Sequence, residues 1–232
     1  MAQIDRVRLP DGTIVRPTEW TSTPYWTTVE FSATQSGTLS GFSYGLGGTV
    51  PGSVGNRRAF LIDTNLRGDG GIIQENAELL LFALQVEPFM RISDATDYAT
   101  NNVAGTPPVP FVSAANILNW QRDVLLRLRI ANEKPFLNHP VGFFPAGVGV
   151  DVHMGAANGV DGNPVLAADN GRARASAIRT IATPHRINPG ETWGVDFVVA
   201  PPNGLNLDFG DDTDARLVAK TYAVGYRKRP VV

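Results

Sequence analysis

The stretch Gly190-Glu191-Thr192-Trp193-Gly194-Val195-Asp196-Phe197-Val198-Val199 decides the fold class of this chain. Every second residue of this stretch from Trp193 onwards is apolar: Trp193, Val195, Phe197 and Val199. Alternation with a period of two places successive side chains on opposite faces of a β-strand, so this strand has one face in a core. Residues 216–227 repeat the alternation, with Val218, Tyr222, Val224 and Tyr226. We therefore expect the last part of the chain to be built into sheets.

Strand-like segments recur along the whole chain. Apolar alternation, or a high content of β-branched and aromatic residues, marks eight of them: 26–33, 38–45, 58–63, 79–87, 124–131, 141–152, 192–200 and 216–227. A weaker strand signal covers 174–182. The 24 Gly and 17 Pro show no collagen-like period and are typical of many strands joined by tight turns. The sequence thus predicts an all-β protein.

Two long polar segments, 93–116 and 153–171, interrupt the strands and have the composition of exposed loops. The pattern of 113–120 predicts one short helix, with Ser113 as its N-cap. Neither an internal repeat nor a shift in composition divides the chain. We therefore expect an N-terminal arm or short extra strand over 1–24 and a single β-domain over 25–232.

Charge and composition argue against several classes of function. The formal net charge of -2 provides no surplus of Lys and Arg to neutralise phosphates, so we expect no direct binding to nucleic acid. The absence of cysteine excludes disulfides, thiolate metal sites and cysteine nucleophiles. The sequence starts without an apolar signal segment, and no apolar run approaches the ~20 residues that span a bilayer. We therefore expect a protein made in the cytoplasm.

Candidate catalytic and metal-binding residues are few. His139, His153 and His185 lie far apart in the sequence, without the spacing of paired metal ligands, and favour structural roles. An acidic cluster offers hard oxygen ligands of the kind that bind Ca²⁺, although the residue order of an EF-hand is absent. Its members are Asp208, Asp211, Asp212 and Asp214. We expect this cluster to be an acidic turn rather than a metal site, and we expect no cofactor.

The glycine-rich segment 45–52 and a set of carboxylates each have a functional and a structural interpretation. Segment 45–52 lacks the Gly-Lys-Ser/Thr end of a P-loop, which favours a hairpin loop over a phosphate site. Four carboxylates provide a glycosidase pair only if folding brings two of them to face each other. They are Glu30, Glu87, Asp123 and Asp196.

Aromatic residues give the sequence its remaining candidate for a binding site. Exposed aromatic rings can stack on sugars, but core packing is the simpler explanation for them. The rings in question belong to Trp20, Tyr25, Trp26 and Trp120. With no catalytic constellation evident, the pattern favours a scaffold rather than an enzyme.

Three segments resemble coat proteins of tailless icosahedral bacteriophages. Arg127-Leu128-Arg129-Ile130-Ala131-Asn132-Glu133-Lys134-Pro135-Phe136, followed by Pro140-Val141-Gly142-Phe143-Phe144-Pro145-Ala146-Gly147, looks like their mid-barrel strand pair. Ile187-Asn188-Pro189-Gly190-Glu191-Thr192-Trp193 is similar to the Pro-Gly-Glu turn that leads into their penultimate strand. Val224-Gly225-Tyr226-Arg227-Lys228-Arg229-Pro230-Val231 looks like their closing strand. The order of the eight strand candidates also resembles the eight-stranded viral jelly roll.

This resemblance implies a single eight-stranded jelly-roll β-sandwich or barrel with long loops and at most one short helix. The length of 232 residues hardly accommodates the roughly sixteen strands of a double jelly roll. The implied function is that of a non-enzymatic capsid subunit of the membrane-containing phage type, located in the virion. Its implied partners are other copies of itself, other capsid proteins and an inner membrane beneath the shell.

Two other classes of function stay open at this point. The first is a carbohydrate- or receptor-binding β-sandwich, including a virion spike or a carbohydrate-binding module. The second is a β-sandwich enzyme such as a glycosidase. Exposed aromatic rings in a groove favour the first class, and two facing carboxylates favour the second.

Overall fold

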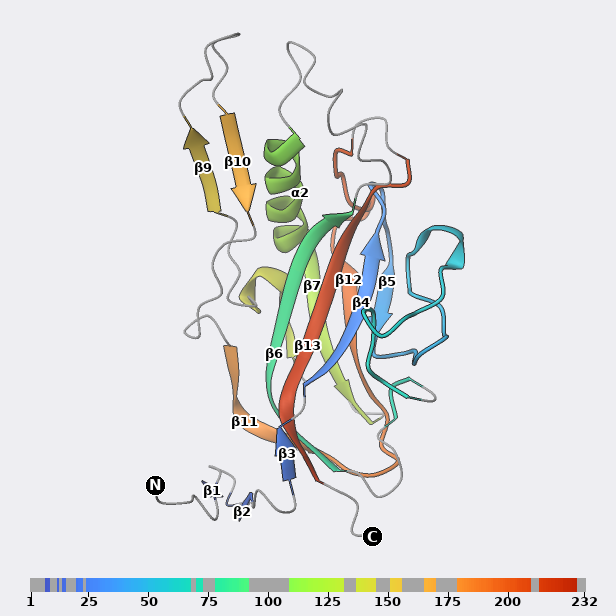
Figure 1. The fold of residues 1–232 in the computed structure, drawn as a ribbon, viewed down its shortest axis with the longest axis vertical. Helices are drawn as coiled ribbons and strands as arrows, with labels where there is room; N and C mark the ends of the chain where they lie inside the picture. Colours follow the sequence, from blue (N-terminus) through green and yellow to red (C-terminus); the bar gives the residue numbers. More distant parts are fainter. Residues whose placement is uncertain are drawn as a thin grey trace.

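The computed structural model describes residues 7–8, 12, 14–15, 20–22, 24–67, 70–72, 78–91, 109–131, 137–144, 151–155, 165–169, 179–209 and 213–228. Most of these residues lie in antiparallel strands, and the α-helix among them is α2 (Val109–Asp123). Two sheets pack face to face across a shared core (Figure 1). The prediction of an all-β sandwich is therefore confirmed.

The first sheet is centred on the long strand β13 (Arg216–Lys228). Its order is β11 (Arg179–Ile187), β6 (Glu78–Arg91), β13 and β4 (Tyr25–Phe31). The short strand β3 (Trp20–Ser22) pairs with the last residues of β13, on the same edge as β4. β13 thus joins β4 and β3 on one side to β6 on the other.

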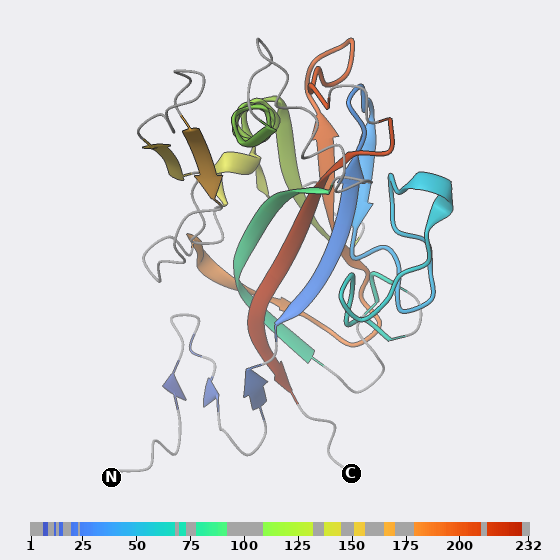
Figure 2. The same ribbon diagram turned by 45° about the horizontal axis from the view of Figure 1, so that its top comes forward.

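The second sheet consists of β5 (Thr38–Gly41), β12 (Trp193–Val199), β7 (Val124–Ile130) and β8 (Leu137–Pro140), in that order. Its central pair, β12 and β7, is in register from Trp193 opposite Ile130 to Val199 opposite Val124. Figure 2 shows β4, β13 and β6 as one layer and β5, β12 and β7 as the other.

The strand pairs of the two sheets are nested along the chain. β7 pairs with β8, β6 with β11, β5 with β12 and β4 with β13. Each pair encloses the previous one in sequence, and successive pairs alternate between the two sheets. A single antiparallel ribbon that wraps around a core produces this pattern. This pattern is compatible with the jelly-roll arrangement that the resemblance implies.

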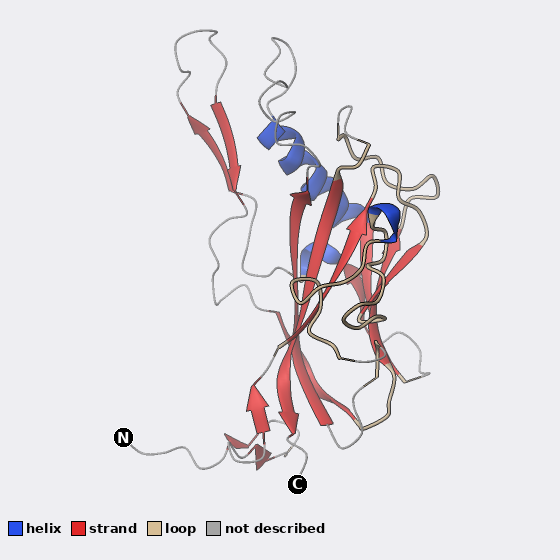
Figure 3. Cartoon of the chain, turned by 45° about the vertical axis from the view of Figure 1, so that its right-hand side comes forward, coloured by secondary structure: helices blue, strands red, loops and turns tan. Residues whose placement is uncertain are grey.

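Smaller elements lie outside the two sheets. β1 (Val7–Arg8) pairs with β2 (Ile14–Val15), and β9 (Asp151–Gly155) pairs with β10 (Val165–Asp169). Figure 3 shows the β9–β10 hairpin beside α2, away from the strands of the sandwich. Two single-turn 3₁₀ helices, η1 (Val54–Asn56) and η2 (Val141–Phe143), complete the elements.

The core lies between the sheets and is rich in aromatic rings. Phe31 from the first sheet packs edge to face against Phe197 from the second, with ring centroids 5.7 Å apart. Trp120 of α2 fills the space beside both rings, 5.5 Å from Phe31 and 6.2 Å from Phe197. All three side chains are fully buried. The helix therefore supplies part of the core that the two sheets do not fill by themselves.

The helix differs from the sequence prediction in length. It begins at Val109 rather than after Ser113, so Ser113 lies inside the helix and is not its N-cap. Eight residues of the segment expected to be a loop over 93–116 are therefore helical. The earlier start has a local signal in Pro110, because proline is tolerated in the first turn of a helix, where its missing amide proton is not needed. A bilayer-spanning helix needs about 20 apolar residues, and no helix in the described ranges meets that requirement.

One of the eight predicted strands is wrong, and another is wrong over its first residues. Residues 58–63 form a turn, with a single bridge between Arg58 and Thr49. In 141–152, residues 141–143 form η2, 145–150 lie outside the described residues, and 151–152 belong to β9. β8 and β11 are strands of the two sheets that the eight predictions did not include. β11 overlaps only the end of the weak signal at 174–182, and β10 lies inside the segment 153–171 that was expected to be a loop.

The edge position of β8 and β11 explains why the sequence pattern does not predict these two strands. β8 and β11 are the outermost strands on one side of each sheet. Asn138, His139 and Pro140 of β8 are exposed, so that strand has no apolar alternation. β11 contains Pro184 at the irregularity between Thr180 and His185, which is where a sheet tolerates proline.

The two faces of β7 provide a direct test of this sandwich. Leu126 is fully buried between the sheets, whereas its neighbour Leu125 points to the other face and is half-buried. We expect Leu126→Ala to lower the free energy of unfolding by about 2–5 kcal/mol, because it leaves a cavity in the core. Leu125→Ala removes the same atoms and should cost less than half as much. Urea denaturation measures both variants, and equal losses would contradict the assigned register.

Candidate functional site

The acidic cluster lies in the connection between β12 and β13. Asp208 and Asp214 are exposed there, and Asp211 and Asp212 fall outside the described residues. The side-chain amide of Asn116 on α2 donates to the carbonyl oxygen of Asp208 at 2.5 Å and accepts from its amide at 2.8 Å. Among the residues that the structure describes, no three His, Asp or Glu side chains gather to hold a metal ion. Because two of the four carboxylates lie outside that part, the absence of a metal site stays a prediction.

The histidines lie on three different strands. His139 is exposed on β8 and stacks on Phe143, with ring centroids 4.7 Å apart. His185 is half-buried on β11, and burial lowers its pKa. His153 lies in β9, where the side chains are outside the described part. His139 and His185 belong to different sheets, so the fold does not bring these two together as a pair.

The four candidate carboxylates are held by different partners. Glu30 of β4 accepts hydrogen bonds from Arg57 at 2.7 Å and from Arg91 at 2.9 Å. Asp196 of β12 lies in the other sheet. This separation places the two on different layers of the sandwich, where they cannot flank one substrate bond.

The other two carboxylates also have partners of their own. Asp123, the last residue of α2, pairs with Arg122 at 2.8 Å, and this hydrogen bond lowers the pKa of Asp123. Glu87 of β6 accepts a hydrogen bond from the Tyr222 hydroxyl at 2.8 Å. Burial, together with this hydrogen bond, raises the pKa of Tyr222. Each carboxylate thus has a structural explanation.

Most of the aromatic candidates are part of the core. Trp20, Tyr25 and Trp120 are buried, so their rings are not available for stacking on a sugar. Trp26 is half-buried on the outer face of β4. Its Nε1 donates to the carbonyl of Leu61 at 3.0 Å, and Nζ of Lys220 lies 5.6 Å from its ring centroid. The structure therefore gives no support to sugar binding by these four residues.

The glycine-rich segment 45–52 is a loop, and its amides are used within the loop. The amides of Gly47 and Gly48 donate to the carbonyls of Ala59 and Gly45, each at 3.0 Å. The amide of Val50 donates to the carbonyl of Arg57, also at 3.0 Å. The 3₁₀ turn η1 that follows is a single turn and provides no helix N-terminus for an anion. The expectation of a loop without the geometry of a phosphate site agrees with these contacts.

An ion-pair cluster around two buried carboxylates anchors the long connection between β5 and β6. We call it the Arg57 cluster, and it consists of Glu30, Arg57, Asp63 and Arg91. The guanidinium of Arg57 donates two hydrogen bonds of 2.8 Å to Asp63 and a third to Glu30. The hydrogen bond to Asp63 is the largest cause that raises the pKa of Arg57. Arg91 reaches Glu30 from β6, so the cluster ties the connection to two strands of the first sheet.

Asp63 makes this anchor dependent on pH. Burial tends to raise the pKa of Asp63, but hydrogen bonds from Arg57 and from the amide of Phe60 outweigh it, and the net shift is downward. A carboxyl whose folded pKa is lowered contributes its full stability above its ordinary value of about 3.9. That contribution is lost as the pH falls through the lower folded value. We expect the connection to loosen only in acid.

The anchored connection presents an apolar tip to solvent. Phe60, Leu61 and Ile62 follow one another there and are 65%, 63% and 72% exposed. The sequence analysis assigned this run to a strand because of its apolar composition. The sequence offered no clear signal against a strand, because three consecutive apolar residues also occur in the buried strand β6, as Leu79, Leu80 and Leu81. We refer to Phe60, Leu61 and Ile62 as the apolar tip.

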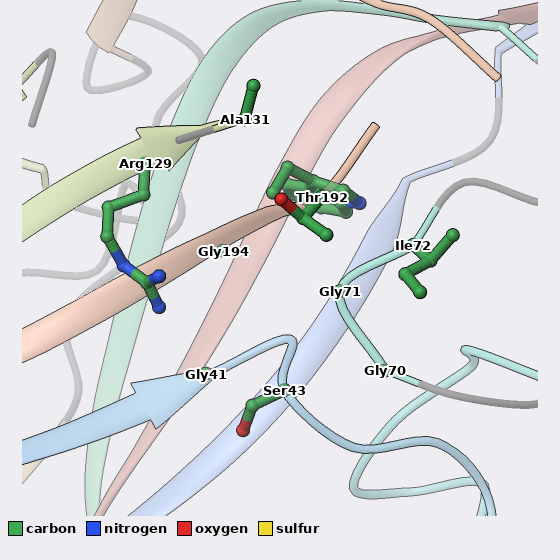
Figure 4. A pocket seen from close by; sticks show the side chains of 10 residues that line it. Gly41, Ser43, Gly70, Gly71, Ile72, Arg129, Ala131, Thr192 and Gly194 are labelled. Carbon is green, nitrogen blue, oxygen red and sulfur yellow. The ribbon is translucent and has the colours of Figure 1, made fainter. Parts of the chain in front are cut away.

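A small pocket opens at the ends of β5 and β7 and the start of β12. Ten residues line it: Gly41, Ser43, Gly70, Gly71, Ile72, Arg129, Ala131, Thr192, Trp193 and Gly194 (Figure 4). Its volume is about 220 Å³. Gly71, with φ of +76°, brings its carbonyl to the amide of Trp193 at 2.7 Å, and Ile72 forms a bridge with Thr192. Backbone contacts therefore fix this wall of the pocket.

Arg129 gives the pocket its charged side. Figure 4 shows its side chain extending from β7 across β12 towards the end of β5. The guanidinium forms an ion pair with Asp196 through Nε, and its Nη2 donates to the same carboxylate at 2.9 Å. Ser40 of β5 also donates to Asp196, at 2.6 Å. We refer to this cavity as the Arg129 pocket.

Comparisons with known proteins do not assign the chain to a family. No family model matches the sequence, and a search of curated proteins finds no match either. The geometry of the described residues is therefore the basis for any functional proposal.

The Arg57 cluster is tested by removing its central charge. We expect Arg57→Met to lower the free energy of unfolding by about 3 kcal/mol, because it leaves the buried carboxylates of Glu30 and Asp63 without this partner. The matched control is Arg122→Met, which breaks the exposed pair with Asp123. Exposed pairs contribute little, so the control should unfold like the parent. A similar loss in both variants would contradict a structural role for the cluster.

Two glycines of the same connection test how closely it packs on β4. Gly47 and Gly52 both have positive φ, but only at Gly52 would a Cβ meet backbone, 1.8 Å from the carbonyl oxygen of Glu30. We expect Gly47→Ala to destabilise the fold by about 1–2 kcal/mol through backbone strain. Gly52→Ala adds a steric clash and should cost about 3 kcal/mol more. Thermal unfolding compares the two, and equal midpoints would contradict the close contact.

Proposed function

We propose that this chain is a structural virion protein: a capsid subunit that assembles with other copies of itself into an icosahedral shell. The nested pairing of β4 with β13, β5 with β12, β6 with β11 and β7 with β8 is the observation that carries the proposal. Such nested pairing supports a jelly roll, a fold that is common in viral capsids. The same fold occurs in lectins and cupins, so the surface and the buried residues must help to discriminate between them.

The edges of the sandwich are suited to lateral contacts. The outer edge strand β8 is four residues long, and three of its side chains are exposed. A short edge that ends in proline resists uncontrolled strand pairing, as the edges of native sheets usually do. In a closed symmetric shell, such edges and the loops beside them become interfaces between subunits.

The proposed partners follow from the same role. Other copies of the chain and other capsid proteins are the expected contacts. A net charge of -2 provides no electrostatic attraction for a genome. This fits a shell of the membrane-containing phage type, in which an inner membrane separates the protein from the nucleic acid. The proposal places synthesis in the host cytoplasm and the mature protein in the virion.

The two alternative classes have less support. A carbohydrate- or receptor-binding β-sandwich, such as a virion spike, was suggested by aromatic residues, and three of the four are buried. A glycosidase requires two facing carboxylates, and the four candidates are each held by a different partner. Neither class explains why the connection that the Arg57 cluster anchors exposes an apolar tip.

The capsid proposal is tested by assembly of the purified protein. We expect light scattering and electron microscopy to show particles or large oligomers that form as the protein concentration increases. Protein that stays monomeric at millimolar concentration would contradict the proposal. Glycan-array binding by such a monomer would support the carbohydrate-binding alternative instead, and hydrolysis of a chromogenic glycoside would support the enzyme.

A further inference from the structure

The apolar tip is an exposed surface that the fold holds in a fixed position. The backbone of Leu61 accepts the hydrogen bond from Trp26 Nε1, and the amide of Phe60 donates to Asp63 at 2.9 Å. Asp63 is in turn held by Arg57. A segment that could bury its apolar side chains by collapsing onto the sheet is thus fastened with them pointing outward.

The Arg129 pocket is too small for most ligands but large enough for a side chain. Clefts that bind small molecules usually measure about 300–1,000 Å³, and this one holds about 220 Å³. Gly194 helps to keep it open, because a Cβ there would lie 3.6 Å from Nη2 of Arg129. Asp196 neutralises Arg129 at its side, so an uncharged group can enter without leaving a lone charge buried.

The size of the tip indicates what covers it. Three large side chains that are about two-thirds exposed present roughly 300–400 Å² of apolar surface. If the tip docks into a matching hollow, both partners together bury roughly 600–800 Å², which is below the about 1,200–2,000 Å² of a stable complex. One such contact is too small for a permanent dimer. It suits a weak contact that is repeated many times between identical subunits.

We propose that the apolar tip of one subunit docks into the Arg129 pocket of a second copy of this chain. The inference rests on the proposed function, because it describes one lateral contact of the shell. Every copy then carries both the tip and the pocket, which is a heterologous contact; such contacts build closed rings from identical subunits when the rotation between neighbours closes. Phe60, Leu61 or Ile62 fills the cavity, and Ile72 and Thr192 at its rim contact the rest of the tip.

Cysteine cross-linking tests the contact, because the chain contains no cysteine. Leu61→Cys is mixed with an equal amount of Thr192→Cys under assembling conditions, and disulfide dimers are counted on a non-reducing gel. We expect a dimer in the mixture and little in either variant alone. The control is a mixture of Leu61→Cys with Ser36→Cys, because Ser36 is exposed and belongs neither to the apolar tip nor to the Arg129 pocket. This mixture should give no mixed dimer. Dimers of Leu61→Cys with itself at the same yield would overturn the proposal in favour of a contact between two tips.

A charge at the tip provides a second test that does not depend on oxidation. We expect Leu61→Asp to raise the protein concentration needed for assembly at least about tenfold, because a carboxylate cannot enter an apolar contact worth roughly 1.5 kcal/mol or more. Leu118→Asp is the matched control, because Leu118 is a leucine on α2 that is 55% exposed. This variant should assemble at the same concentration as the parent. Unfolding curves check that both variants are folded.

The outcomes separate this inference from the function on which it rests. If the parent protein never assembles, the capsid proposal fails. If the parent and Leu61→Asp assemble at the same concentration, the tip is not a contact, and the inference fails while the capsid proposal stands. Loss of assembly in both aspartate variants would also overturn it, since the effect would then reflect added charge rather than the tip.

Discussion

The two-sided pairing of β13 is the constraint on which the rest of the structure depends. β13 is hydrogen-bonded along most of its length to β6 on one side and to β4 and β3 on the other. It comes last among the strands in sequence, so the first sheet cannot close until nearly the whole chain has folded. Pairings between residues so far apart in sequence close large loops, which makes such folds slow to form and strongly cooperative. Once β13 is in place, β4 has a fixed outer face on which the long connection can be anchored.

That connection shows how the fold combines a firm base with an exposed surface. Burial of Glu30 without partners would be costly, and Arg57 and Arg91 supply the compensating charges. Tyr44 adds a second anchor: its hydroxyl donates to the carbonyl of Thr28 at 2.5 Å and accepts from the amide of that residue at 3.0 Å. Burial raises the pKa of Tyr44 to about 12, so this hydroxyl keeps its proton at any physiological pH. The base of the connection is thereby fixed to β4 by hydrogen bonds and ion pairs.

The sequence predicted the strands with a buried face and missed those without one. β12 and β7 were visible because residues such as Val195 and Leu128 alternate in and out of the core, and β6 was visible as a continuous apolar run. β8 and β11 are edge strands, where exposure and Pro184 remove that pattern. The pocket could not be predicted, because its walls come from four segments that only the nested pairing brings together. The tip was read as a strand because composition alone does not distinguish an apolar run that packs from one that the fold exposes.

An isolated chain gains nothing from an apolar tip that its own ion pairs keep away from the core. Large apolar side chains in water are unfavourable by about 25 cal/mol for each Å² that could be buried, and a flexible loop would relieve this by folding inward. Here Asp63 and Trp26 prevent that relief by hydrogen bonds on either side of Leu61. A second surface that covered the tip would remove this cost. Because a contact group that is already held in its bound position loses less entropy on docking, the anchor would strengthen the contact proposed between copies of the chain.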